Sequence, residues 1–247
     1  MRLIDRNAQT NRWRRLPALE KAALAIGMMI AALCSPGWIA QGVVLVSCAA
    51  LLLWGARIPG RDILHSASVP AGFIALSSVA QVVTLHAENG WPVLGLSEAA
   101  LLPAGFIALR SLACVGALLF LALTTPLTDI LRLLRRAGIG PEASDIALMM
   151  FRFIWLTLDC VESSSRSQAN RLGYDGYRRS LRSLGLLLAA LLPRVLNRAQ
   201  RVEAGLAARG YDGELRFIDL EEKLSLARLG AAAGLVIAIA VIGRVGF

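Results

Sequence analysis

Apolar residues gather in five long stretches of the chain, four in its first half and one near its end. The stretches are 16–34, 38–54, 63–85, 99–124 and 224–243. Each is close to the length of about 20 apolar residues that a helix needs to cross a bilayer. The pattern therefore predicts five membrane-spanning helices, with Lys21 in the first extending its ammonium group to the interface.

The composition points to the same class of protein. Hydrophobic residues make up 56% of the 247 residues and charged residues 17%, whereas soluble domains average about 45–50% and about 25%. This excludes a soluble enzyme, a disordered tail and a disulfide-rich secreted module. None of the four cysteines forms a Cys-x-x-Cys pair, so we interpret them as small buried hydrophobic residues.

Positive charge alternates from loop to loop. The net charge is +9, and fourteen arginines lie in the region 126–222, whereas 35–37 and 86–98 contain no lysine or arginine. Because basic loops stay in the cytoplasm, we expect the N-terminus and the region 126–222 to be cytoplasmic and the C-terminus to be outside. Topology accounts for the basic charge, so no nucleic-acid partner is expected.

The region between the fourth and fifth stretches predicts a domain of its own. A short helix with an apolar stripe follows Pro126, and two longer helices are expected at about 142–172 and 178–209. The predicted fold class is an all-α integral membrane protein with a cytoplasmic three-helix domain inserted before the last span. Its parts are four spans in 1–125, the cytoplasmic helices in 126–222 and the final span in 223–247.

The two long cytoplasmic helices end in similar sequences. Gly-Tyr-Asp-Gly begins at Gly173 and again at Gly210, and each glycine is expected to take the left-handed conformation that ends a helix. Arg171 precedes the first copy, and Ala208 and Arg209 precede the second. These ends are either ordinary basic helix caps or a pair of arginine anchors that bind a soluble partner.

Arg110 is a charge near the middle of the fourth stretch. An arginine there costs about 2.5–3.5 kcal/mol on insertion scales and normally has a partner. It either bonds backbone carbonyls of neighbouring helices or contacts a partner subunit, and the sequence leaves both interpretations open.

Several segments together suggest a family. They are Thr124-Thr125-Pro126, 131–136, Phe151-Arg152-Phe153, Ser183-Leu184-Gly185 and 208–213. The chain resembles the transmembrane T component of energy-coupling-factor (ECF) ABC transporters, in the cobalt/nickel branch (the CbiQ family), which carries two Ala-Arg-Gly motifs on cytoplasmic helices. Ala208-Arg209-Gly210 matches one motif. The other departs, because aligning the two Gly-Tyr-Asp-Gly copies places Arg171 opposite Ala208.

The resemblance implies a non-catalytic coupling subunit of a cobalt or nickel importer in the bacterial cytoplasmic (inner) membrane. Its partners would be two cytoplasmic ABC ATPase subunits, a membrane S component that binds the substrate, and a small accessory membrane subunit. The ATPases would hydrolyse ATP-Mg, and this chain would bind no cofactor. The implied ATPase-coupling residues are Arg171, Gly173, Ala208, Arg209 and Gly210. The implied contacts to the S component are Met149, Met150, Phe151, Phe153, Trp155 and Arg110.

Two other classes of function are weaker alternatives. A membrane-embedded lipid-modifying enzyme needs several carboxylates at one site, and the second to fifth stretches contain no Asp or Glu. A conventional ABC permease subunit needs polar groups inside several spans, and only Arg110 offers one. The chain has no Gly-x-x-x-x-Gly-Lys-Ser/Thr phosphate loop. Its two histidines, His65 and His86, lie near opposite ends of the third stretch, so no metal site is expected.

Overall fold

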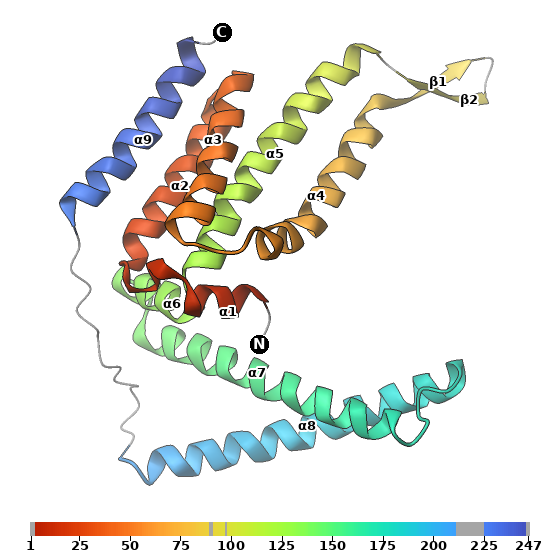
Figure 1. Ribbon diagram of the computed structural model, residues 1–247. Helices are drawn as coiled ribbons and strands as arrows, with labels where there is room; N and C mark the ends of the chain where they lie inside the picture. Colours follow the sequence, from red (N-terminus) through yellow and green to blue (C-terminus); the bar gives the residue numbers. More distant parts are fainter. Residues whose placement is uncertain (1–2, 89–90, 97, 211–224, 246–247) are drawn as a thin grey trace. The chain divides into compact units, whose positions relative to one another are not determined.

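The protein is almost entirely helical in the computed structural model, which describes residues 3–88, 91–96, 98–210 and 225–245 (Figure 1). This confirms the predicted fold class. A two-stranded antiparallel hairpin between α4 and α5 is a local addition, because a loop was expected there. The elements are α1 Leu3–Thr10, η1 Arg12–Arg15, α2 Ala18–Cys34, α3 Trp38–Ala50, η2 Leu51–Gly55, α4 Gly60–Val82, β1 Val83–Glu88, β2 Trp91–Leu96, α5 Glu98–Thr124, α6 Leu127–Arg136, α7 Pro141–Ala169, α8 Tyr177–Ala207 and α9 Leu226–Val245.

The chain packs as two compact units. One comprises Met1–Ile130 and Glu221–Phe247, and the other comprises Leu131–Leu220. The first unit contains α1 to α5 and α9, the second contains α7 and α8, and α6 begins in the first and ends in the second. The sequence division at 126 and 222 concerns the two sides of a membrane and stays a prediction.

Five helical segments of the described chain are long and apolar enough to cross a membrane, as a multi-pass protein requires. They are Trp38–Gly55, Gly60–Val82, Ala100–Thr124, Tyr177–Ala207 and Leu226–Gly243. Four of them correspond to predicted spans.

The set differs from the prediction at one span. The segment expected as the first span forms α2, which begins only at Ala18 and has 17 residues. It is therefore about 26 Å long, shorter than a hydrocarbon core of about 30 Å. The additional segment is α8, which was expected in the cytoplasm. Its central part is rich in leucine, which makes the helix apolar enough to cross a membrane.

Small residues hold the membrane helices close together. Helices α2, α3, α5 and α9 lie side by side (Figure 1), and Ala32, Ala113 and Ala117 are at most 1% exposed between them. Such residues let helix backbones approach closely where lipid provides no hydrophobic driving force. The larger side chains Met28 and Phe120 are fully buried and fill the remaining space.

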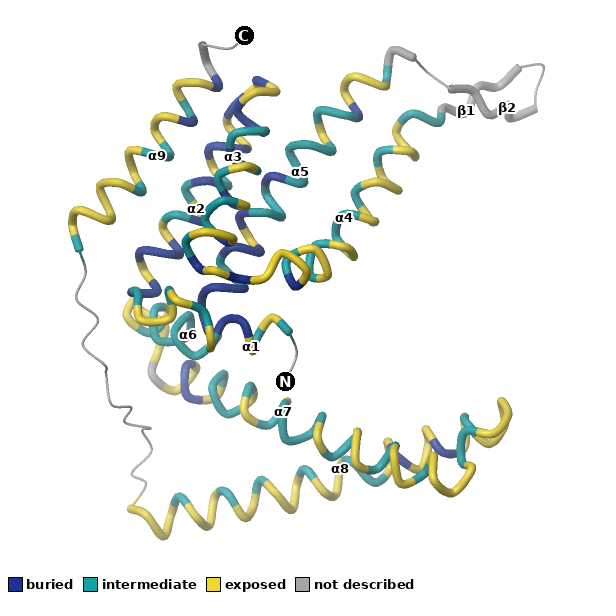
Figure 2. The backbone as a smooth tube through the Cα atoms, in the orientation of Figure 1, coloured by how far each residue is buried: buried dark blue, intermediate teal, exposed yellow. Residues whose placement is uncertain are grey.

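Helix α4 is covered on one face only. It packs along α5 (Figure 1), and most of its length is exposed or half-buried in Figure 2. Its exposed apolar side chains include Leu64, Val69, Phe73 and Leu76, which are 68–79% exposed. An apolar face of this kind suits contact with lipid chains, because a helix hydrophobic all round is buried in protein or membrane.

Lys21, in the first turn of α2, joins α2 to η1 and to the end of α5. Lys21 is only 2% exposed, and its Nζ donates hydrogen bonds to the carbonyls of Trp13 at 3.2 Å and Thr124 at 3.1 Å. A cation suits this position because the last carbonyls of α5 lack helical donors. The prediction that Lys21 extends to the interface is therefore wrong.

Side-chain contacts also hold the second unit together. Arg135 of α6 pairs with the buried Asp145 of α7 at 3.4 Å. Farther along, Nη1 of Arg194 on α8 donates to Oγ of Ser164 on α7 at 2.6 Å and lies 3.5 Å from Sγ of Cys160. These contacts join the second half of α7 to the middle of α8.

Candidate functional site

The ends of α7 and α8 have the same backbone hydrogen-bond pattern. At the end of α7, the N–H groups of Asn170, Arg171 and Leu172 donate to carbonyls four, three and three residues earlier, at 3.0 Å each. The corresponding N–H groups at the end of α8 donate in the same order, at 3.0, 3.0 and 3.1 Å. The two cap residues have φ and ψ of −63° and −19°, and −64° and −19°.

This pattern sets which residues correspond. Asn170 is equivalent to Ala208, Arg171 to Arg209 and Leu172 to Gly210. Alignment on Gly-Tyr-Asp-Gly placed Arg171 opposite Ala208, and the structure corrects it by one residue. Each helix end therefore presents an exposed arginine directly before a residue with positive φ.

The residue with positive φ is a glycine at one end only. Gly210 has φ +76°, as predicted, whereas at the first end Leu172 has φ +58°. The expectation that Gly173 takes this conformation is wrong. The N–H of Gly173 bonds the carbonyl of Gln168 at 2.9 Å, and the N–H of Leu172 bonds that of Ala169 at 3.0 Å. These two bonds form a Schellman motif, which ends the helix around Leu172.

Gly173 serves close packing between the two helices. A Cβ at this position would lie 2.6 Å from Oγ of Ser183 and 2.9 Å from the carbonyl oxygen of Gln168. Ser183, on the second turn of α8, is buried and donates from Oγ to the carbonyl of Gly173 at 2.8 Å. Only a residue without a side chain lets α8 approach the end of α7 in this way.

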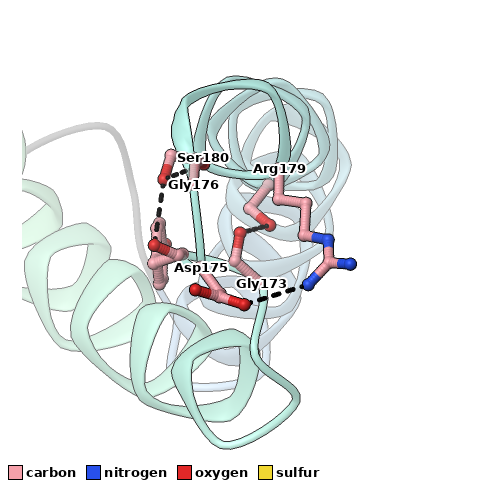
Figure 3. Close-up of polar contacts among 7 residues, drawn as sticks. Gly173, Asp175, Gly176, Arg179 and Ser180 are labelled. Carbon is pink, nitrogen blue, oxygen red and sulfur yellow. Dashed lines mark hydrogen bonds and ion pairs between the residues drawn. The ribbon is translucent and has the colours of Figure 1, made fainter.

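Further polar contacts hold the connection from α7 to α8 (Figure 3). Arg179 pairs with Asp175 at 3.1 Å, and Oγ of Ser180 donates to the carbonyl of Gly176 at 3.0 Å. Gly176 has φ +92°, which an L side chain rarely adopts. Arg171 therefore follows a rigid helix and precedes a turn that is bonded on both sides.

The second helix end lies at the opposite end of α8. Ala208, Arg209 and Gly210 are all exposed. The second Tyr-Asp-Gly, at 211–213, lies outside the described residues. At 1.5 Å per residue, the 31 residues of α8 separate the two arginine ends by about 46 Å.

The aromatic and methionine residues expected to contact a membrane partner differ in exposure. Met150 is 61% exposed. Met149 and Phe153 are half-buried. Phe151 and Trp155 pack edge to face, with ring centroids 6.1 Å apart. The other exposed large hydrophobic side chains of the two helices are Ile146, Ile154, Tyr177, Leu181, Leu184, Leu186, Leu188, Leu192 and Leu196.

Arg110 bonds within its own helix bundle. Its Nη2 donates to the carbonyl of Ser35 at 3.0 Å, and its guanidinium lies 4.7 Å from the ring centroid of Phe106. Gln41, fully buried, also donates to the carbonyl of Ser35, at 3.0 Å. The first of the two interpretations of Arg110, a bond to the backbone of a neighbouring helix, is thus the one that the structure displays.

Several contacts that shape this part of the chain carry no local signal in the sequence. The bond between Ser183 and Gly173 and the contacts of Arg194 join positions that no motif connects. Among the described residues, no three His, Cys, Asp or Glu side chains come together to hold a metal ion.

Comparison with known proteins identifies the family. The profile of the cobalt transport protein family, CbiQ, matches residues 9–218. The chain belongs to the CbiQ family. It is 35% identical over 240 residues to the cobalt transport protein CbiQ of Rhodobacter capsulatus, covering 97% of both chains. It is 28% identical over 220 residues to CbiQ of Salmonella typhimurium, covering 85% of this chain and 97% of that one.

A third relative is named as a fused protein. A protein of Methanocorpusculum labreanum, named as a fused CbiMQ cobalt transport protein, is 26% identical over 97 residues, covering 39% of this chain and 16% of its own length. Membership of the CbiQ family, together with the five helices of the described residues that are apolar enough to cross a membrane, makes this chain a multi-pass membrane component of cobalt transport.

Proposed function

We propose that this chain is the energy-coupling subunit of an ECF-type ABC importer that takes up cobalt or nickel. It transmits the movement of two cytoplasmic ATPase subunits to a membrane S component, and it is not itself an enzyme. The observation that carries the proposal is the shared geometry of the two helix ends, in which Arg171 and Arg209 occupy equivalent positions.

The helix ends suit contact with a pair of ATPase subunits. Each arginine is exposed and directly follows the cap residue of a long helix, where backbone hydrogen bonds set its position. Arginine is a frequent anchor at protein interfaces because its planar fork makes several directed hydrogen bonds. With the two ends about 46 Å apart, each one contacts a separate ATPase subunit.

The apolar surface of α7 and α8 suits contact with the S component. Leucines along α8 and Met150 on α7 are exposed apolar side chains, and their burial against a partner would be favourable. Methionine side chains also repack readily when a partner moves. The fused CbiMQ relative supports a second membrane subunit as partner, and a small accessory membrane subunit completes the assembly. The arginine-rich region 126–222 lies in the cytoplasm, as the positive-inside rule requires.

Charge reversal at the helix ends tests the proposal. Arg209→Glu and Arg171→Glu are made separately and expressed with the other transporter subunits. Truncating one partner of a desolvated charge pair costs about 2–5 kcal/mol, and reversal costs at least as much. We therefore expect each variant to reach the membrane at the wild-type level but to lose most of the co-purifying ABC ATPase, detected by mass spectrometry after purification in mild detergent.

Arg198→Glu is the matched control. Arg198 is also exposed on α8, about three turns before the end of the helix. The substitution Arg198→Glu changes the net charge by the same amount and leaves both helix ends unaltered. ATPase recovery should therefore stay near the wild-type level. Equal ATPase recovery and equal transport-linked ATP hydrolysis in all three variants would show that these ends are only helix caps.

A further inference from the structure

A polar pocket lies where the N-terminal segment meets the connection between η2 and α4. Its lining includes Asn7, Thr10 and Arg12 on one side and residues 56–59, with Arg57, on the other. The volume is about 320 Å³, at the small end of the range of about 300–1,000 Å³ for ligand pockets. All of these residues belong to the first unit.

The walls of the pocket are fixed from behind. The N–H of Arg12 bonds the carbonyl of Ala56 at 3.4 Å. The Trp13 ring packs so close to Gly55 that a Cβ there would lie 2.4 Å from a ring atom. Nδ2 of Asn11 donates to the carbonyl of Thr124 at 3.2 Å, which joins this segment to the end of α5. The pocket is therefore part of the folded bundle.

Two arginines supply the free hydrogen-bond donors of the pocket. No hydrogen bond or ion pair joins the guanidinium of Arg12 or of Arg57 to another described residue. The nearby carboxylate of Asp62 is already bonded by Arg6 at 3.2 Å and by Asn7 at 2.9 Å. Uncompensated positive charge next to a pocket of this size favours an anion with several oxygens, because each guanidinium can bond two of them.

The backbone conformation of Arg57 also favours a ligand-binding role for the pocket. Its φ is +55°, the left-handed conformation that a residue other than glycine rarely adopts. Glycine would take this conformation without strain. Strained residues persist where the surrounding structure holds them, often at ligand-binding positions.

The exposed apolar residues near the pocket favour an anionic lipid over a free anion as its ligand. Leu53 and Trp54, in the turn just before it, are 43% and 81% exposed, and Leu64, one turn into α4, is 76% exposed. The Leu53 side chain lies against Gly60, since a Cβ there would be 3.6 Å from its Cδ2. Exposed tryptophan beside arginine at the end of membrane-spanning helices is typical of the headgroup region. A free anion would use the arginines but not this apolar rim.

We infer that the pocket binds the phosphate of an anionic phospholipid headgroup, with the acyl chains on the apolar rim of Leu53, Trp54 and Leu64. Basic pockets between membrane helices bind anionic headgroups in this manner. The inference is independent of the proposed coupling function, because it uses only the first unit.

Native mass spectrometry of the full chain tests the inference. The protein is loaded with phosphatidylglycerol or phosphatidylcholine in mild detergent, and retained lipid is counted. We expect wild-type protein to retain phosphatidylglycerol, and the double variant Arg12→Gln/Arg57→Gln to bind it about 30-fold more weakly, given two basic contacts of ordinary strength. The control is Arg14→Gln/Arg15→Gln, which removes the same charge from η1 outside the pocket lining.

Each outcome decides the question. Loss of phosphatidylglycerol in the pocket variant with retention in the control supports the site. Equal loss in both double variants overturns it, because general surface charge would then explain binding. Displacement of the lipid by equimolar inorganic phosphate also overturns it, in favour of a site for a free anion. Arg57→Gly, which suits the backbone conformation, replaces the double variant if that protein does not fold, and should again weaken phosphatidylglycerol binding.

Discussion

Gly173→Ala tests whether the first helix end is positioned by close packing. The added methyl carbon would lie 2.6 Å from Oγ of Ser183 and 2.9 Å from the carbonyl oxygen of Gln168. The carbonyl cannot move aside, because it accepts the 2.9 Å bond from the Gly173 N–H that ends α7. The turn between α7 and α8 therefore has to open.

The free-energy cost follows from these contacts. Overpacking by one carbon costs about 1–3 kcal/mol, and loss of the 2.8 Å bond from Ser183 to Gly173 costs about 0.5–1.5 kcal/mol. Replacing glycine also restricts the unfolded chain, which returns about 0.4–1 kcal/mol. The net destabilisation of the turn is therefore about 0.5–4 kcal/mol.

Hydrogen exchange of the full chain in detergent measures this change locally. A loss of about 2 kcal/mol speeds exchange of the amides around the turn by about 30-fold, if they exchange by local opening. Gly185→Ala is the matched control, since Gly185 lies inside α8 and, apart from its chain neighbours and the nearby backbone of α8 itself, no atom comes within 4 Å of the point where an alanine Cβ would lie. Alanine there should slow exchange slightly, because it favours the helix by about 0.8–1.0 kcal/mol. Unchanged exchange in Gly173→Ala would refute the packing argument.

Substitutions at two further residues, Lys21 in α2 and Asp62 in α4, probe the contacts that hold the N-terminal segment of the first unit. Lys21→Met removes the hydrogen bonds to the carbonyls of Trp13 and Thr124, and should destabilise by about 1.5–3 kcal/mol, seen as a lower Tm in detergent. Asp62→Ala leaves the buried Nδ2 of Asn7 without its 2.9 Å acceptor and should destabilise by about 1–3 kcal/mol. Asp62→Asn keeps an acceptor and loses only a partly exposed ion pair, so its Tm should change by less than half as much. An equal fall in Asp62→Ala and Asp62→Asn would contradict this account.

The membrane helices were largely predictable from the sequence. Apolar length is a local property, so Trp38–Gly55, Gly60–Val82, Ala100–Thr124 and Leu226–Gly243 appear close to where the pattern placed them. The first predicted span forms the shorter helix α2, because Pro17 precedes a helix that begins only at Ala18. The hairpin after α4 was not foreseen, since the pairing of β1 with β2 depends on two segments meeting.

The candidate site was predicted in part. Arg209 before Gly210 was recognised from the sequence, because a glycine after a basic last turn is a common helix end. The position of Arg171 was placed one residue out of register, because the repeated Gly-Tyr-Asp-Gly suggested a correspondence that the backbone hydrogen bonds do not follow. A leucine with positive φ is rare enough that no sequence rule would have chosen Leu172 for that position.

The sequence by itself determined the class of the protein, the approximate limits of its helices and the two arginine-bearing helix ends. These properties depend on residues close together along the chain, where hydrophobic period and capping preferences act. Only the tertiary structure decided that Lys21 is buried against Thr124 and that Arg110 bonds the carbonyl of Ser35. It also decided that Oγ of Ser183 bonds the carbonyl of Gly173. Each of these contacts joins residues from different elements, and the free energy of burying a polar group depends on the partner that the fold brings to it.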